Sequence, residues 1–140
     1  MKKTVLIAIA MLALSLSALA QTIVKAERDS TYADVCYQRN IQLPGYAYAN
    51  LIGLCSWDPA INGLQLFLIA IPMDPTEEAY KIELANNILF ITEVKTIKEQ
   101  LVISYTEDYI TASGGFGRRN GDIYARSVNM KEGTFSVLKK

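Results

Sequence analysis

The chain contains no histidine, and this absence limits the chemistry that it can perform. Histidine is the most frequent general base in enzymes and a member of the usual serine and cysteine triads. Two cysteines without a histidine also make a poor zinc site. The sequence therefore predicts a protein that is not an enzyme, with no catalytic residue, no metal site and no cofactor.

Neither sign of charge is in excess, because 14 basic residues stand against 14 acidic ones. If the N-terminal segment that contains Lys2 and Lys3 is cleaved from the chain, 12 basic residues remain and the net charge is −2. Binding to a generic polyanion favours the opposite sign. We expect no nucleic-acid partner, although Gly-Gly-Phe-Gly-Arg-Arg at 114–119 is similar to RNA-binding tails.

Long apolar runs are scarce, and the one at the N-terminus is typical of a secretory signal peptide. Two lysines precede the apolar residues 4–16, and Ala18-Leu19-Ala20 forms a small-x-small cleavage site. The run is short for a membrane span, and no charged stop follows it. We expect a cleaved signal at 1–20 and a mature domain at 21–140. That domain would be secreted or periplasmic in a bacterium and not integral to a membrane.

Only two cysteines are present, Cys36 and Cys55. An oxidising compartment favours their pairing, and the absence of a C-x-x-C motif opposes a redox role. Closing this short loop is worth roughly 3 kcal/mol in the chain-entropy account. The two residues are therefore predicted to form a structural disulfide between the arms of a hairpin.

The remaining sequence predicts strands bounded by turn residues and one long helix. The predicted strands are 32–41, 46–57, 64–71, 100–106 and 122–130, with 131–140 as a tail that adds a short strand or frays. The helix is predicted over 74–96, with Asp74 as N-cap, Pro75 at the first position and Glu77 completing a capping box. Tyr80, Leu84, Ile88 and Ile91 share one side of this helix.

Three strands, a helix and two strands follow one another in the order of the OB-fold. The sequence thus predicts a mainly β protein with one central α-helix, built as a five-stranded Greek-key barrel. The alternative is a small α+β sandwich made of the same elements.

The segment "SGGFGRRNGD" at 113–122 raises the question of a phosphate-binding loop. It lacks the final glycine of G-x-G-x-x-G and the Lys-Ser or Lys-Thr of a P-loop, and it precedes a strand. Asn120-Gly121 is a type I′ turn signal. We therefore predict a hairpin turn at 119–122 within a long loop over 107–121.

Aromatic residues near predicted strand ends offer faces on which a sugar can stack. Trp57 follows Ser56 in a turn and is assigned to stacking, with the equally open alternative that it caps the core. Tyr105 and Arg118 are assigned to hydrogen bonds with the same ligand. Trp57, Tyr105 and Arg118 form the predicted ligand-binding set.

The stretch from "TEEAYKIELANNILFITEV" to "IYARSVNM" resembles the enterotoxin B subunits of AB5 bacterial toxins. The segment "VCYQRN…LIGLCSWD" is similar to subtilase-cytotoxin and pertussis-like B subunits. The resemblance implies a homopentamer whose helices line a pore, a partner toxin A subunit and a face that binds cell-surface glycans.

The first hypothesis is accordingly a secreted, non-enzymatic subunit that oligomerises and recognises cell-surface glycans. The alternative is a small periplasmic protein-interaction or inhibitor protein, in which exposed aromatic residues and the 107–121 loop contact another protein. A third hypothesis is a small hydrolase that uses Glu107 and Asp122.

Overall fold

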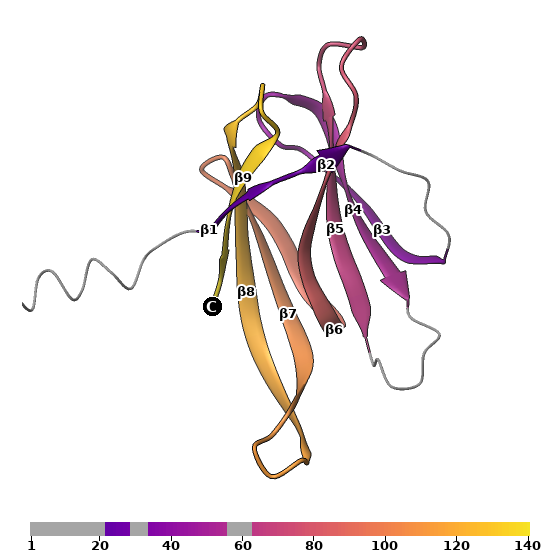
Figure 1. Cartoon of the computed structure of the whole chain (residues 1–140), viewed down its shortest axis with the longest axis vertical. Helices are drawn as coiled ribbons and strands as arrows, with labels where there is room; N and C mark the ends of the chain where they lie inside the picture. The colour runs from indigo at the N-terminus through magenta and orange to yellow at the C-terminus, as the bar shows by residue number, and fades with distance from the viewer. Residues whose placement is uncertain (1–21, 29–33, 56–62) are drawn as a thin grey trace, which may run out of the picture.

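The computed structural model describes residues 22–28, 34–55 and 63–140, and within these ranges it contains β-strands and no helix (Figure 1). The mainly β class is confirmed, whereas the predicted central helix is not found. The predicted signal peptide and Trp57 lie outside the described residues. The strands are β1 Thr22–Lys25, β2 Glu27–Arg28, β3 Val35–Ile41, β4 Tyr46–Cys55, β5 Leu64–Pro72, β6 Tyr80–Ile97, β7 Gln100–Ile110, β8 Phe116–Asn129 and β9 Thr134–Lys139.

All of these strands belong to one antiparallel sheet. Its order is β1-β9-β8-β7-β6-β5-β4-β3, and β2 pairs with β6 outside that path. Each strand from β3 to β9 therefore lies beside the next one in the chain. This up-and-down order differs from the Greek-key order expected of an OB-fold, and no helix covers the sheet in the described ranges as an α+β sandwich requires.

The N-terminal segment 22–28 connects two strands that are not neighbours. Its first part pairs with β9, where Thr22 lies opposite Val137. Its last part pairs with β6, where Arg28 lies opposite Tyr80. Because β7 and β8 lie between β6 and β9, this segment bridges them and holds the sheet in a curled shape (Figure 1).

The hydrophobic core fills the inside of this curl. Strand alternation places every second side chain on the inner face, as Leu101, Ile103 and Tyr105 show on β7. The largest fully buried side chains come from β4 to β9: Leu51, Leu66, Leu68, Ile88, Leu101, Ile103, Ile123 and Phe135. The sheet is thus stabilised mainly by apolar contacts across its own concave face.

Strand β6 occupies the segment for which a helix was predicted, and that prediction is wrong. The segment is rich in β-branched and aromatic residues, which favour strands. Its helical spacing has another origin: the inner-face residues Ile88, Ile91 and Val94 are three positions apart.

Two β-bulges produce this spacing. The pairing of β6 with β7 shifts register between Ile88 and Phe90 and again between Ile91 and Glu93. Each bulge inserts one extra residue, so inner positions recur every three residues instead of every two. A bulged strand therefore gave an apolar pattern close to the helical repeat of 3.6.

The predicted helix N-cap belongs to a turn between β5 and β6. Asp74 Oδ1 accepts hydrogen bonds from the Thr76 backbone N at 2.9 Å and from Thr76 Oγ1 at 2.7 Å. The backbone N of Glu77 donates to the carbonyl of Asp74 at 3.1 Å. The two bonds from Thr76 lower the pKa of the Asp74 carboxyl. An aspartate before proline thus caps a turn as readily as a helix.

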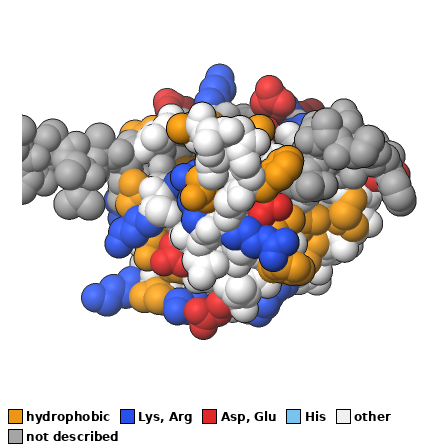
Figure 2. All heavy atoms as spheres, turned by 90° about the horizontal axis from the view of Figure 1, so that it is seen from below, with side chains coloured by type: hydrophobic (Ala, Val, Ile, Leu, Met, Phe, Trp, Pro, Cys, Tyr) orange, Lys and Arg blue, Asp and Glu red, His pale blue; other side chains and the backbone are white. Residues whose placement is uncertain are grey.

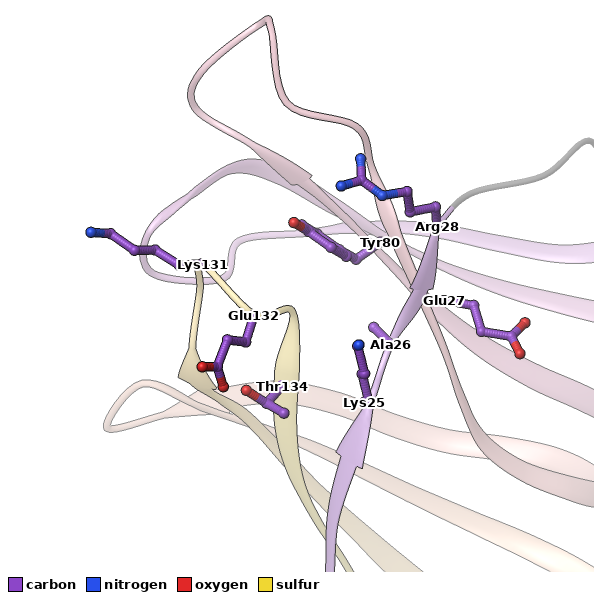
Figure 3. A pocket seen from close by; sticks show the side chains of 8 residues that line it. All are labelled: Lys25, Ala26, Glu27, Arg28, Tyr80, Lys131, Glu132 and Thr134. Atoms are coloured by element: carbon purple, nitrogen blue, oxygen red, sulfur yellow. The ribbon is translucent and has the colours of Figure 1, made fainter.

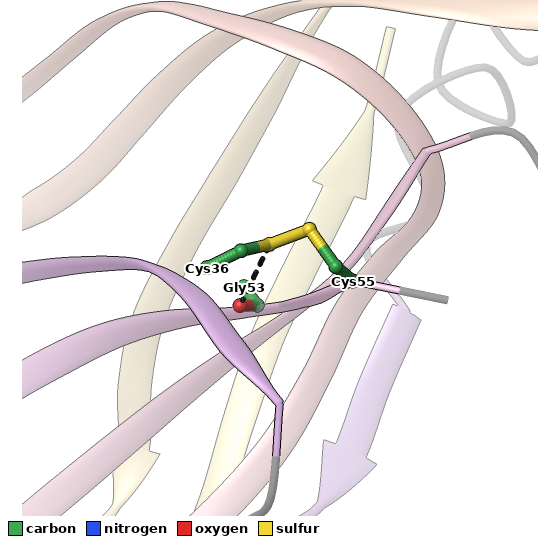
Figure 4. The surroundings of a disulfide bond; sticks show 3 residues. All are labelled: Cys36, Gly53 and Cys55. Atoms are coloured by element: carbon green, nitrogen blue, oxygen red, sulfur yellow. Dashed lines mark hydrogen bonds between the residues drawn. A yellow bond between two sulfur atoms is a disulfide. The ribbon is translucent and has the colours of Figure 1, made fainter. Parts of the chain in front are cut away.

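The predicted disulfide between Cys36 and Cys55 is confirmed (Figure 4). It joins β3 to the end of β4, with the two Cα atoms 5.7 Å apart. Cys36 occupies a bulge between Val35 and Tyr37, and its Sγ lies 3.5 Å from the carbonyl oxygen of Gly53. The bond fastens the edge strand β3 to the sheet.

Candidate functional site

A polar groove opens where β6 and β7 part from one another. Their pairing ends at Ile88 opposite Glu107, but β7 continues to Ile110, where β8 is the only described strand that pairs with it. On β6, Asn87 has a φ of +60°, a left-handed conformation that asparagine tolerates better than most residues. The divergence of the two strands leaves a space between Asn86-Asn87 and the outer part of β7.

This space, the β6–β7 groove, has a volume of about 620 Å³. Binding pockets for small ligands lie in this size range. Its lining is rich in amide, carboxylate, phenol and cationic groups: Asn86, Asn87, Tyr105, Glu107, Asp108, Tyr109, Ile110, Arg119, Asn120, Lys139 and Lys140. Such a surface offers donors and acceptors to a polar ligand, together with aromatic faces.

An ion pair and an aromatic ring form one wall of the groove. Arg119 Nε donates to Glu107 Oε1 at 2.5 Å, and this bond raises the pKa of Arg119. The guanidinium carbon lies 5.2 Å from the centre of the Tyr109 ring, a cation–π distance. Arginine has five N–H donors, and the exposed side chain keeps donors accessible to a ligand.

Two glycines of "SGGFGRRNGD" make room for the tyrosines of the groove. Gly121 lies opposite Tyr105 and Gly117 opposite Tyr109. A Cβ on Gly117 would lie 2.6 Å from the Tyr109 ring, and one on Gly121 would lie 2.9 Å from the Tyr105 hydroxyl. The predicted turn at 119–122 is wrong, because these residues lie within β8; the chain turns at Thr111–Gly115.

Of the three residues predicted to bind the ligand, Tyr105 and Arg118 do not come together. Tyr105 is buried at the base of the groove, where burial first and then Glu107 raise its pKa. Arg118 does not line the groove; it is an odd number of residues from Gly121 and therefore lies on the opposite face of β8. Trp57 lies outside the described residues.

Arg118 belongs to a row of polar cross-strand pairs on the outer face of β7 and β8. Its Nε donates to Asp108 Oδ1 at 3.2 Å. Thr106 donates to Asn120 at 2.8 Å and Ser104 to Asp122 at 2.7 Å in the same row. Arg119, the neighbour of Arg118, lies on the inner face and lines the groove.

Sequence reasoning also missed Asn86, Asn87 and Tyr109. The signals were present, since two asparagines interrupt an apolar segment and Tyr105 and Tyr109 have the same spacing as Gly117 and Gly121. Reading these signals required the register of β7 against β8, which the predicted loop at 107–121 concealed.

The carboxylates of the hydrolase hypothesis lie on different faces of the hairpin. Glu107 faces the groove with Arg119, whereas Asp122 is in the outer row with Ser104. They cannot flank one scissile bond. In the part of the chain that the structure describes, no three Cys, Asp or Glu side chains gather in a way that would hold a metal ion.

A second cleft, of about 870 Å³, lies where the N-terminal segment crosses from β9 to β6 (Figure 3). Two of its charged side chains form ion pairs with residues beside the cleft: Arg28 Nη1 lies 2.7 Å from Glu78 Oε2, and Glu27 Oε2 lies 3.9 Å from Lys81 Nζ. A Cβ on Gly133 would lie 2.6 Å from two carbons of the Tyr80 ring, so this ring packs directly against the glycine. We interpret this cleft as a structural junction, because the pairing of β1 with β9 and that of β2 with β6 meet there.

No protein-family model matches this chain, and no match is found among curated proteins or solved structures. The resemblance to toxin B subunits therefore rests on the sequence pattern alone. None of the described segments forms a helix with the length and apolar character needed to cross a membrane.

Proposed function

We propose that this chain is a secreted, non-enzymatic binding protein that recognises a cell-surface carbohydrate in the β6–β7 groove. The observation that carries the proposal is the composition of the groove, in which Tyr109 lies beside the Glu107–Arg119 pair and the Asn86-Asn87 amides. Planar polar groups bind sugar hydroxyls in defined directions, and an aromatic face packs against sugar C–H groups. No catalytic group is needed for this task.

The proposal concerns a single chain and does not depend on a ring of subunits. The expected pentamer, its pore and its toxin A subunit were implied by the resemblance to toxin B subunits. The helix predicted at 74–96, with its apolar residues Tyr80, Leu84 and Ile88, would line that pore. Those apolar residues belong to the inner face of β6 and already pack in the core of one chain. Support for this binding mode comes from the groove alone.

A glycan array probed with the mature chain tests the proposal. Tyr109→Ala removes the aromatic wall and Arg119→Gln removes the cation, and each is expected to weaken retention about tenfold or more. Tyr48→Ala is the matched control, because Tyr48 is an exposed tyrosine of β4 outside the groove. The control is expected to bind as the unsubstituted chain does.

Failure of the unsubstituted chain to retain any glycan would overturn the proposal, as would equal retention by Tyr109→Ala. Trp57→Ala tests the remaining sequence-predicted contact in the same assay, and loss of retention with the fold intact would add Trp57 to the site.

The alternative function, interaction with another protein, predicts a different dependence. In the described ranges, β3 pairs only with β4, so its outer edge can accept a strand from a partner. Binding of that kind would depend on the β3 edge and would be unaffected by Tyr109→Ala.

A further inference from the structure

The turn between β7 and β8 carries an exposed apolar pair at the tip of a long hairpin. Ile110 and Phe116 lie opposite one another and are 73% and 80% exposed. The nine residues 109–117, which we call the hairpin tip, contain no charged side chain. Figure 1 shows this hairpin extending beyond the other strands at one end of the molecule.

Several polar groups of the hairpin tip are hydrogen bonded to one another. The Thr111 backbone N donates to the Gly115 carbonyl at 2.8 Å, and the Gly114 N donates to the Thr111 carbonyl at 2.9 Å. The Thr111 hydroxyl accepts from the Gly115 N at 3.0 Å and lies 3.0 Å from the Ser113 hydroxyl. Moving such a turn out of water costs less free energy than moving a turn whose polar groups are hydrogen bonded to solvent.

Cations surround the base of the tip, while their carboxylate partners are covered. The Arg118 side chain is 71% exposed and its partner Asp108 only 19%; Arg119 is 62% exposed and Glu107 only 12%. Figure 2 views the molecule from this end and shows blue Lys and Arg side chains beside the white and orange surface. The accessible charge at the base of the tip is therefore positive.

We propose that the hairpin tip inserts into the interface of an anionic lipid bilayer. Phe116 and Ile110 would enter the boundary between headgroups and acyl chains, and Arg118 would contact the anionic headgroups. Burial of exposed apolar area drives insertion, and the cations add an attraction that salt screens. This inference does not rest on carbohydrate binding, because Phe116, the residue that carries it, does not line the groove.

The turn between β5 and β6 provides an internal comparison. Met73 is 73% exposed, as Ile110 is, but it is followed by Asp74, Glu77 and Glu78. An anionic surface repels this turn and attracts the hairpin tip. Exposure of an apolar side chain alone would not distinguish the two ends of the molecule.

Sedimentation with carbohydrate-free vesicles tests the proposal on the full mature chain. The chain is expected to bind phosphatidylcholine vesicles that contain phosphatidylserine, and to bind pure phosphatidylcholine several-fold more weakly. Phe116→Ser is expected to reduce binding about tenfold or more, whereas Met73→Ser leaves it unchanged. Raising the salt from about 0.1 M to about 1 M should lower binding to the anionic vesicles.

A second variant does not depend on loss of function. Phe116→Trp keeps an aromatic ring at the tip, and its fluorescence should shift to the blue when anionic vesicles are added, beyond any shift of the unsubstituted chain. Circular dichroism of each variant verifies the fold.

Absence of vesicle binding by the unsubstituted chain overturns the proposal, as does equal binding by Phe116→Ser. Self-association that depends on Phe116, without vesicle binding, also overturns it and assigns the tip to a protein interface. Because the vesicles carry no sugar, failure here leaves the glycan-array result unaffected.

Discussion

Strand β7 has an inner part, from Leu101 to Tyr105, and an outer part, from Glu107 to Ile110, which are stabilised in different ways. From Leu101 to Tyr105 the strand has β6 on one side and β8 on the other, and its inward side chains are buried. Beyond Glu107 only β8 remains beside it. There the inward side chains are an ion-paired Glu107 and an exposed Tyr109 over a glycine.

This difference separates stability from availability for binding. The inner part contributes to the core, and its side chains have no surface to offer a ligand. The outer part depends on cross-strand pairs that contribute modestly each, and its side chains border the groove and the hairpin tip. Substitutions in the two parts should therefore have opposite consequences.

The largest contrast is expected between Ile103→Ala and Tyr109→Ala. Ile103 is fully buried, so its truncation leaves a cavity and should lower the free energy of unfolding by about 2–5 kcal/mol. Tyr109→Ala removes an exposed ring and should cost less than about 1 kcal/mol, while it weakens retention of glycan as predicted above. Urea unfolding followed by circular dichroism measures both values. Equal destabilisation would remove the distinction between the two parts of β7.

A smaller contrast is expected between the two glycines opposite the tyrosines. A Cβ on Gly121 would lie 2.7 Å from the Lys140 carbonyl oxygen and against the buried Tyr105, so Gly121→Ala should cost about 1–3 kcal/mol. A Cβ on Gly117 meets only the Tyr109 ring, which is exposed and can move aside. Gly117→Ala should therefore change the midpoint of urea unfolding less than Gly121→Ala does; the reverse order would contradict the assigned packing.

The smallest effect is expected from the titration of Tyr105. Burial raises the pKa of Tyr105 above the usual value of 10.0. Below pH 10 the phenol is neutral in both states, and above it the unfolded chain loses its proton first. The free energy of unfolding should thus fall as the pH rises above 10.

For Tyr105→Phe, the free energy of unfolding should fall less steeply over the same pH range. Urea unfolding midpoints at several pH values measure this difference. Some slope remains in the variant, because burial also raises the pKa of Tyr46. Identical slopes for the two proteins would show that Tyr105 ionises as easily in the folded chain as in the unfolded chain.

Much of the sheet was predictable from local pattern. The strands near 35–41, 46–55, 64–72 and 100–106 and the disulfide follow from apolar runs, turn residues and compartment. These features depend on neighbours in the chain, so the sequence alone carries them.

The predictions that were wrong concern features that depend on partners distant in the sequence. The bulges that give β6 a helix-like spacing of apolar residues exist only in its pairing with β7. Without that pairing, the spacing in the sequence predicted a helix. Asn120-Gly121 is a strong turn signal, yet Gly121 is there because Tyr105 lies opposite. The candidate groove is lined by Arg119 and not by Arg118, the residue predicted to bind the ligand, because the face of a strand changes at every position.

The most direct test of the account is a titration of the mature, isotope-labelled chain with the glycan retained on the array, followed by the backbone amide resonances. The account predicts that the largest shifts occur at Asn86, Asn87, Tyr109 and Arg119, with little change along β3 and β4. Shifts confined to β3 and β4, with the β6–β7 groove unaffected, would contradict it.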